Sequence, residues 1–467
     1  MRVLLISTNR EHSPFPVAPL GALCVNGALK KAGYSVDFLD MNFINFPKRA
    51  IAAALKTATY DVIAFSIRNL DNCFYAFPKS FFSEVEKIVN TVRDLCDTPT
   101  VVGGSGFSVD PIGWMKRLNF DYGIVGEGEK VFVELLDYLQ AGKSPSALNG
   151  VITKENLDKN NNFPSLQPIA NLDEIAPPSH EFCKYKKYIN RGGFVSIQSK
   201  RGCPFSCIFC VYPQLEGSEY RLRCPELVVD EIERTIHDTG INLFFFTDSV
   251  FNAPRSHCLE ICNEIARRRL SLKWMAYCNP LGFDFELAQA MKQSGCAGIE
   301  FGLDAATEKM IESLGKPFSQ SEIKKSLQAA FDAKIPFAIH LLFGGPGETV
   351  DDVKESQNFL DSCAKSNAVF ASIGIRIYLG TPIYQTAMKQ GVISTNSDLF
   401  HPTYYVSEGL TEKPVQAIDV VAHKRNEWTT PTDWNKLPIK AIQTILNRFK
   451  IHPQWQNIQN YGKYVRR

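Results

Sequence analysis

The chain has 467 residues, of which 45% are hydrophobic and 21% are charged, so it can bury a large core and is not disordered. Its 51 lysines and arginines nearly balance 49 aspartates and glutamates, and this formal net charge of +2 argues against a nucleic-acid-binding protein. No apolar run reaches the ~18 residues that would span a bilayer, and the opening MRVLLIS is too short for a signal peptide. We therefore expect a cytoplasmic protein.

Short apolar runs alternate with helix-length segments from residue 1 to about residue 145. Five runs have the length and composition of buried strands: 2–7, 35–39, 61–66, 100–103 and 122–125. Parallel strands joined by crossover helices form an open α/β sheet. We predict an α/β fold that begins with a Rossmann-like, five-stranded parallel sheet over residues 1–145.

The next segment, 146–190, is polar and proline-rich, and we interpret it as a linker. Six more strand-length runs then alternate with helical patterns: 194–199, 242–247, 272–277, 298–302, 337–343 and 371–378. This rhythm predicts a partial (β/α)6 barrel over residues 191–388, with its chemistry at the carboxyl ends of the strands. A small C-terminal segment, 389–467, has no clear repeat and is expected to cap the barrel or meet the substrate.

Three of the thirteen cysteines lie within one loop directly after the first barrel strand. Cys203, Cys207 and Cys210 have the spacing C-x-x-x-C-x-x-C, and three soft thiolates so close together can hold one metal centre. A closed structural site wants four protein ligands, so a trio leaves one coordination position open for a substrate or cosubstrate. The alternative is a zinc loop completed by a distant residue, such as His180, Cys183 or Cys224. In a reducing compartment the other cysteines are expected to be buried thiols.

With Phe209 in the aromatic place before Cys210, this loop resembles the defining motif of the radical S-adenosylmethionine (SAM) superfamily. The resemblance covers roughly 194–385. It implies a [4Fe–4S] cluster on Cys203, Cys207 and Cys210, an open iron that binds SAM, and an electron donor such as flavodoxin or ferredoxin. Reductive cleavage of SAM would give a 5′-deoxyadenosyl radical.

Residues near the ends of later barrel strands resemble the segments that contact SAM in this superfamily. The five candidates are Asp248, Glu300, Asp304, Gly345 and Arg376. Many relatives have Glu where this chain has Asp304. A helix cap or surface salt bridge is the alternative for each carboxylate, but their shared position at successive strand ends favours a common site.

Small residues gather on three loops of the predicted N-terminal sheet, and the first loop lacks the G-x-G-x-x-G of dinucleotide folds. These loops resemble the cobalamin-binding domain that precedes the barrel in cobalamin-dependent radical SAM enzymes. The implied cobalamin contacts are Ser66, Arg68, Asn69, Gly103, Gly104, Ser105, Gly126, Glu127 and Gly128. The D-x-H-x-x-G motif that supplies an imidazole to cobalt is absent around His12. We expect Arg68 under the corrin ring, with a loop salt bridge as the alternative.

The resemblance implies a cobalamin-dependent radical SAM methyltransferase that acts on an unactivated carbon, or on phosphorus, of a small-molecule or lipid-like substrate. A cyclase or rearrangement enzyme with the same cofactors is the alternative, and no residue separates the two. Methylthio transfer would need further cluster cysteines, and a non-enzymatic cobalamin sensor would not need the three that are present. No catalytic residue is identified from the sequence.

No acidic residue follows Asp433, whereas seven basic residues do: Lys436, Lys440, Arg448, Lys450, Lys463, Arg466 and Arg467. Such a segment can meet an anionic substrate or make peripheral membrane contact. A solvated helical face is the alternative.

Overall fold

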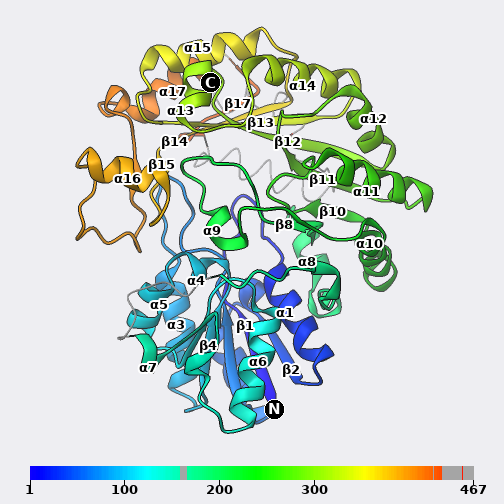
Figure 1. The fold of residues 1–467 in the computed structure, drawn as a ribbon, viewed down its shortest axis with the longest axis vertical. Helices are drawn as coiled ribbons and strands as arrows, with labels where there is room; N and C mark the ends of the chain where they lie inside the picture. Colours follow the sequence, from blue (N-terminus) through cyan, green and yellow to red (C-terminus); the bar gives the residue numbers. More distant parts are fainter. Residues whose placement is uncertain (158–165, 424, 434–454, 456–467) are drawn as a thin grey trace.

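A computed structural model describes residues 1–157, 166–423, 425–433 and 455 of the chain. The residues fold into two α/β units, one from the blue and cyan N-terminal segments and one from the green to orange segments (Figure 1). Among the described residues no helix is long and apolar enough to cross a membrane. None of the thirteen cysteines forms a disulfide, and six of the ten outside the cluster loop are buried as predicted. The prediction is wrong for Cys73, which is exposed, and Cys96, Cys224 and Cys363 are only partly buried.

The first unit is built on a six-stranded sheet with the order β2-β1-β3-β4-β5-β6. Its strands are β1 (Arg2–Ser7), β2 (Ser35–Asp40), β3 (Val62–Ser66), β4 (Thr100–Gly103), β5 (Tyr122–Ile124) and β6 (Val151–Thr153). The five predicted strands are present and mutually parallel. The sixth strand, β6, pairs antiparallel with β5 and lies beyond residue 145, in the segment that we interpreted as linker.

Both faces of this sheet are apolar, as strands covered by helices on each side require. Along β1, Val3 and Leu5 point to one core and Leu4 and Ile6 to the other. The first core packs under α1 (Leu20–Lys31) and α6 (Gly128–Gln140), and the second under α2 (Pro47–Thr57), α3 (Phe82–Arg93) and α5 (Pro111–Leu118). The short helix α4 (Ser105–Val109) follows β4 directly.

The second unit contains a seven-stranded sheet with the order β17-β14-β13-β12-β11-β10-β7, and all of its pairings are parallel. Its strands are β7 (Val195–Ile197), β10 (Leu243–Phe246), β11 (Lys273–Cys278), β12 (Cys296–Asp304), β13 (Phe337–Phe343), β14 (Ala368–Ile373) and β17 (Trp428–Thr429). The six predicted barrel strands are all present. The C-terminal segment adds the edge strand β17, which periodicity did not reveal because it is two residues long.

Helices cover the outer face of this curved sheet (Figure 1). They are α10 (Pro225–Thr239), α11 (Arg255–Arg267), α12 (Phe285–Gln293), α13 (Glu308–Ser313), α14 (Gln320–Asp332), α15 (Val350–Asp361) and α17 (Pro414–Ala422). Serine and threonine side chains cap α14 and α15 with full capping boxes, which explains where these helices begin. The inner face carries a separate small apolar cluster that includes Trp455.

The remaining short elements connect the units or border them. The linking segment holds α7 (Lys154–Leu157), α8 (Tyr185–Ile189) and the short 3-10 helices η3 (Leu172–Glu174) and η4 (His180–Phe182). The pair β8 (Lys200–Arg201) and β9 (Arg221–Leu222) lies with α9 (Tyr212–Glu216) between the two units (Figure 1). Strand β15 (Ile375–Arg376) precedes α16 (Pro382–Lys389), and β16 (Tyr404–Tyr405) follows it and pairs antiparallel with β15.

Candidate cofactor-binding site

The three predicted cluster cysteines lie in one loop between β8 and α9. Backbone hydrogen bonds hold this loop at two points: Cys203 N donates to Gly217 O at 3.1 Å, and Ile208 N donates to Leu314 O at 3.1 Å. Gly202 starts the loop with a positive φ of 84°, and a Cβ there would lie 2.0 Å from the carbonyl oxygen of Glu219. The loop can therefore take this path only with glycine at position 202.

The donor set fits an iron–sulfur cluster. Among the described residues, no three His, Cys, Asp or Glu side chains lie close enough together to hold a single metal ion. A four-iron cluster needs a wider arrangement, since each thiolate binds its own iron. Burial raises the pKa of Cys210 to about 11, so its thiolate needs metal or another cation nearby.

The residues that would complete a zinc site are engaged elsewhere. Both ring nitrogens of His180 are hydrogen-bonded: Nδ1 lies 2.5 Å from the Tyr185 hydroxyl, and Nε2 lies 2.9 Å from a carboxylate oxygen of Glu231. The thiol of Cys224 donates to Glu226 at 2.8 Å. These contacts favour the open three-cysteine interpretation over a closed zinc loop.

Asp304 at the end of β12 pairs with a buried lysine beside the cysteine loop. Lys316 Nζ lies 2.6 Å from the Asp304 carboxylate and 5.7 Å from the ring centroid of Phe209. Burial alone would lower the pKa of Lys316, but Asp304 and the neighbouring Cys207 raise it above its usual value. A positive charge is thus held next to the predicted cluster, and the carboxylate of Asp304, one of the predicted SAM contacts, neutralises it.

The other predicted SAM contacts also have partners within the chain. Asp248, which is 1% exposed, accepts from Ser199 N at 2.7 Å and from Ser199 Oγ at 2.5 Å. Gly345 N donates to the carboxylate of Glu348 at 3.0 Å. A Cβ on Gly345 would lie 2.7 Å from Met310 Cε, so helix packing accounts for this glycine.

Arg376 uses its whole guanidinium inside the protein. Its Nε donates to the fully buried Asp71 at 2.7 Å, and its Nη atoms donate to the carbonyl oxygens of Ile377 and Leu399 at 2.6 and 2.8 Å. Asp71 belongs to the first unit, in the loop after β3. This pair joins the two units through a residue that we predicted as a SAM contact.

The small residues predicted to contact cobalamin do meet at one edge of the first sheet. Gly104 approaches the β3 loop so closely that a Cβ would lie 2.5 Å from Ile67 O. Ser105 Oγ donates to Arg68 O at 2.7 Å, and Gly126 N donates to Ser108 Oγ at 2.9 Å. The remaining predicted contacts stand on the same three loops: Ser66, Asn69, Gly103, Glu127 and Gly128. Adjacent loops with little side-chain bulk leave backbone accessible to a large, flat ligand.

Arg68 faces the space between the units. Its side chain is accessible, yet surrounding protein depresses its pKa by desolvation, so it lies within the interface and not on the outer surface. The groups that favour its charge are Tyr277 of the second unit, Cys73 and Tyr188. Its pKa is influenced by no carboxylate among the described residues, so the salt-bridge alternative is not what the structure has. The Asn69 amide oxygen, in the orientation that satisfies its own hydrogen bonds, accepts from Arg68 at 3.3 Å.

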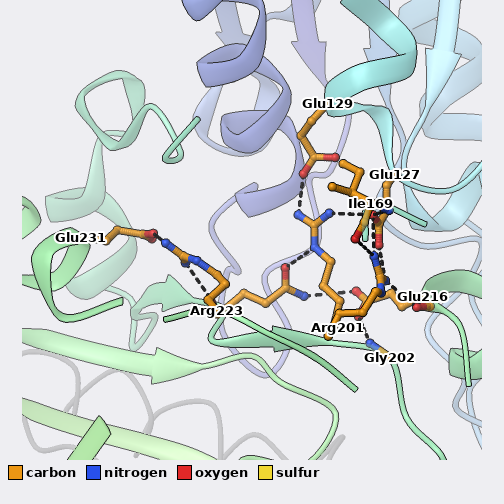
Figure 2. Close-up of polar contacts among 10 residues, drawn as sticks. Glu127, Glu129, Ile169, Arg201, Gly202, Glu216, Arg223 and Glu231 are labelled. Carbon is orange, nitrogen blue, oxygen red and sulfur yellow. Dashed lines mark hydrogen bonds and ion pairs between the residues drawn. The ribbon is translucent and has the colours of Figure 1, made fainter. Parts of the chain in front are cut away.

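Glu127, in contrast, belongs to an ion-pair network between the units (Figure 2). Arg201, two residues before Cys203, lies 2.5 Å from Glu129 and 3.3 Å from Glu127. Arg221 binds Glu127 at 2.5 Å and also donates to Ile169 O at 2.7 Å. Burial would raise the pKa of Glu127, but Arg221 and Arg201 lower it below its usual value. The loop after β5 is thereby tied to the start of the cysteine loop.

Sequence reasoning did not identify His340, Trp455 and Tyr277, which lie inside the barrel beside the predicted residue Glu300. The Glu300 carboxylate accepts from Trp455 Nε1 at 3.0 Å and lies 2.7 Å from His340 Nε2. Tyr277 leaves 42% of its surface exposed on the same inner face. The alternation of β13 would have placed His340 inward, whereas no local pattern indicates Trp455. The basic residues after Asp433 lie outside the described residues.

Comparisons with known proteins agree with both units. Residues 6–136 match the family model of the B12 binding domain, and residues 197–360 match that of the radical SAM superfamily. An uncharacterized methyltransferase of Pyrococcus horikoshii is 30% identical over 318 residues, which cover 67% of each chain. Tryptophan 2-C-methyltransferase of Streptomyces laurentii is 25% identical over 442 residues, or 81% of this chain and 73% of that one.

The fold matches a solved structure along its whole length. The radical S-adenosylmethionine methyltransferase TsrM of Kitasatospora setae, solved with cobalamin and a [4Fe–4S] cluster, superposes with a TM-score of 0.84. The match covers 100% of this chain and 99% of that chain at 22% sequence identity. Together with the thiol loop and the facing loops of the first unit, these relationships show that the chain is a radical SAM enzyme of the cobalamin-dependent family, with a B12-binding domain before its radical SAM domain.

Proposed function

We propose that this enzyme transfers a methyl group from SAM, by way of cobalamin, to an unactivated carbon of a small molecule. The observation that carries the cobalamin part of the proposal is the placement of Arg68. Its guanidinium stands in the interface, without a carboxylate partner among the described residues, on the loops that match the B12-binding domain. His12 does not replace it there, because its Nε2 lies 2.8 Å from Asn42 O and its ring packs on Phe43.

The proposal assigns a task to each part of the chain. Cys203, Cys207 and Cys210 hold the cluster, and the small residues of the three loops give a corrin room to lie against backbone. When bound, the cofactors supply the group-transfer chemistry itself. The ion pairs of Arg201 and Arg376 fix the two units to one another, so that groups bound on either side keep one geometry.

Among the named relatives, methyltransferases support methyl transfer, and a cyclase supports the alternative function. Besides the two methyltransferases above, a cytidylyl-2-hydroxyethylphosphonate methyltransferase of Streptomyces wedmorensis is 22% identical over 88% of this chain. An anaerobic magnesium-protoporphyrin IX monomethyl ester cyclase of Rubrivivax gelatinosus is 26% identical over 76% of it. We expect a small-molecule substrate and an external electron donor.

The deciding experiment follows the methyl group. The protein is purified without oxygen, supplied with iron, sulfide, hydroxocobalamin and a chemical reductant, and given SAM with a deuterated methyl group. We expect labelled methylcobalamin by mass spectrometry, and a labelled product when a deproteinised cell extract is added. Cleavage of SAM to 5′-deoxyadenosine with no label on cobalamin would refute methyl transfer and favour the cyclase alternative.

A further inference from the structure

The interior of the barrel contains a chain of hydrogen bonds centred on Glu300, a predicted SAM contact whose two carboxylate oxygens are both engaged within the chain. Glu300 is 7% exposed and binds two partners, His340 Nε2 at 2.7 Å and Trp455 Nε1 at 3.0 Å. The three residues come from β12, β13 and the C-terminal segment. A buried carboxylate with both oxygens engaged is fixed in orientation, and so are the groups that it binds.

Strand alternation places these side chains on the inside of the barrel. On β13, Ile339 and Leu341 belong to the core under the helices, so His340 between them points inward. Trp455 packs against inward-facing residues, including Phe245 and Met275, and closes that part of the interior. The carboxylate therefore has the indole on one side and the imidazole on the other.

The surface beyond His340 is aromatic and accessible. The imidazole lies 5.0 Å from the ring of Phe370 and 6.0 Å from that of Tyr277, measured between centroids. The side chain of His340 is 35% exposed and Tyr277 is 42% exposed, although both point into the barrel. The described residues leave both side chains accessible, and Arg68 faces Tyr277 from the first unit.

The hydrogen bonds determine which nitrogen of His340 is free. An indole N–H only donates, so one oxygen of Glu300 must accept from Trp455. A carboxylate only accepts, so the neutral imidazole carries its proton on Nε2 and presents Nδ1 as an acceptor. Nδ1 has no hydrogen-bond partner within the described part of the chain.

We propose that His340 orients the substrate by accepting a hydrogen bond at Nδ1, and that the substrate is a planar aromatic molecule with an N–H or O–H donor. Glu300 and Trp455 are positioning residues that fix the proton of the neutral imidazole on Nε2. The aromatic walls select a flat molecule, and the lone pair selects a donor on its rim. This inference rests on the proposed function, since it assigns a substrate to the same barrel.

The first test determines the tautomer of His340, and this measurement needs no catalytic turnover. The holoenzyme is labelled with 15N-histidine, and its eight histidines are recorded by NMR under mildly alkaline conditions. The His340 signals are identified by their loss in His340→Gln. We expect the Nε2–H tautomer in the unmodified protein, and an Nδ1–H tautomer there would overturn the proposal.

Substitution of Glu300 makes this test sharper. In Glu300→Gln the amide oxygen must still accept from Trp455, so the amide NH2 faces His340 and forces the proton onto Nδ1. In Glu300→Gln with Trp455→Phe, the oxygen is released to accept from Nε2–H, and the original tautomer returns. Trp455→Phe alone leaves the tautomer unchanged. A tautomer that does not change in Glu300→Gln would overturn the assigned roles, and circular dichroism checks that each variant is folded.

Ligand binding is the second test, with indole and 1-methylindole as matched probes. Indole should shift the His340 signals, whereas 1-methylindole, which lacks the N–H, should bind roughly tenfold more weakly. Glu300→Gln should remove this difference between the probes. Equal binding of both probes to the unmodified enzyme would overturn the proposal. Neither test measures methylcobalamin formation, which is the readout of the proposed function, so failure of these tests is distinguishable from failure of that function.

Discussion

Arg201 and Glu129 form a buried ion pair of 2.5 Å across the two units of the enzyme. Arg201 directly precedes the glycine that starts the cysteine loop, and Glu129 lies in the first turn of α6. Both side chains are at most 10% exposed. Together with the ion pairs of Glu127, this pair ties the start of the cluster loop to the B12-binding domain.

Removal of the Glu129 carboxylate is expected to lower the free energy of unfolding. In Glu129→Ala the buried guanidinium of Arg201 keeps one carboxylate, Glu127, which Arg221 already binds, and a neutral hydrogen bond to Gln198 Oε1 at 3.0 Å. A buried charge that loses its partner destabilises a protein by about 3–5 kcal/mol, so the free energy of unfolding in urea should fall by a similar amount. Glu134→Ala, on the exposed side of the same helix, is the control. Equal unfolding free energies for the two variants would contradict this role.

Glu348 predicts a dependence of stability on pH. Burial raises the pKa of its carboxyl from 4.5 to about 7, although the N–H groups of Gly344 and Gly345 oppose the shift. The folded protein therefore binds this proton more tightly than the unfolded chain does. Stability should fall as pH rises from about 4.5 to about 7, and level off above that range.

The comparison with Glu348→Gln isolates this effect, because the amide oxygen can still accept from the two glycines. The unfolding free energy of the unmodified enzyme, relative to the variant, should decrease by about 3 kcal/mol across that pH range. Urea titrations at several pH values measure it. A difference that stays constant with pH would show that the carboxyl titrates normally.

The cysteine loop predicts the iron content. Single Cys203→Ala, Cys207→Ala or Cys210→Ala variants, reconstituted without oxygen, should lose most of about four irons per chain, since three thiolates are the whole protein ligand set. Cys363→Ala is the matched control, because this thiol donates to Phe359 O at 3.4 Å on α15, away from the loop. Iron and sulfide are assayed together. Full iron in any loop variant would mean that another ligand replaces the cysteine.

Arg68 predicts a contribution to cobalamin binding. Arg68→Ala removes a charged group that faces the interface, and loss of a charged hydrogen bond typically costs about 1.5–3 kcal/mol, so retention of hydroxocobalamin should weaken roughly tenfold or more. Equilibrium dialysis measures it. Arg49→Ala, whose guanidinium stacks on Phe46 on the far helix α2, should bind as the unmodified protein does. Unchanged retention in Arg68→Ala would remove this residue from the cobalamin site.

The fold was largely predictable because its signals are local. Apolar runs such as 337–343 give the barrel strands directly, and the spacing of Cys203, Cys207 and Cys210 marks the cluster loop within eight residues. Within the two main sheets, two short strands escaped prediction. β6 and β17 have three and two residues, and each depends on a neighbouring strand for its stability, not on its own pattern.

The roles of the polar site residues were less predictable, because their partners are remote in sequence. Glu127 and Arg376 stand where the resemblance suggests cofactor contacts, yet Arg221 is 94 residues from the first and Asp71 is 305 residues from the second. Trp455 is 155 residues from Glu300. Spacing along the chain carries no information about such pairs, since the fold alone brings them together.

The pairing of Asp71 with Arg376 also has a consequence for the order of events during synthesis. Asp71 leaves the ribosome 305 residues before its partner, and at about 5–20 residues per second this delay lasts roughly 15–60 s. The first unit is complete early in that interval, and its loops are not yet covered by the second unit. A cofactor as large as cobalamin thus has its widest access to those loops before the enzyme has finished being made.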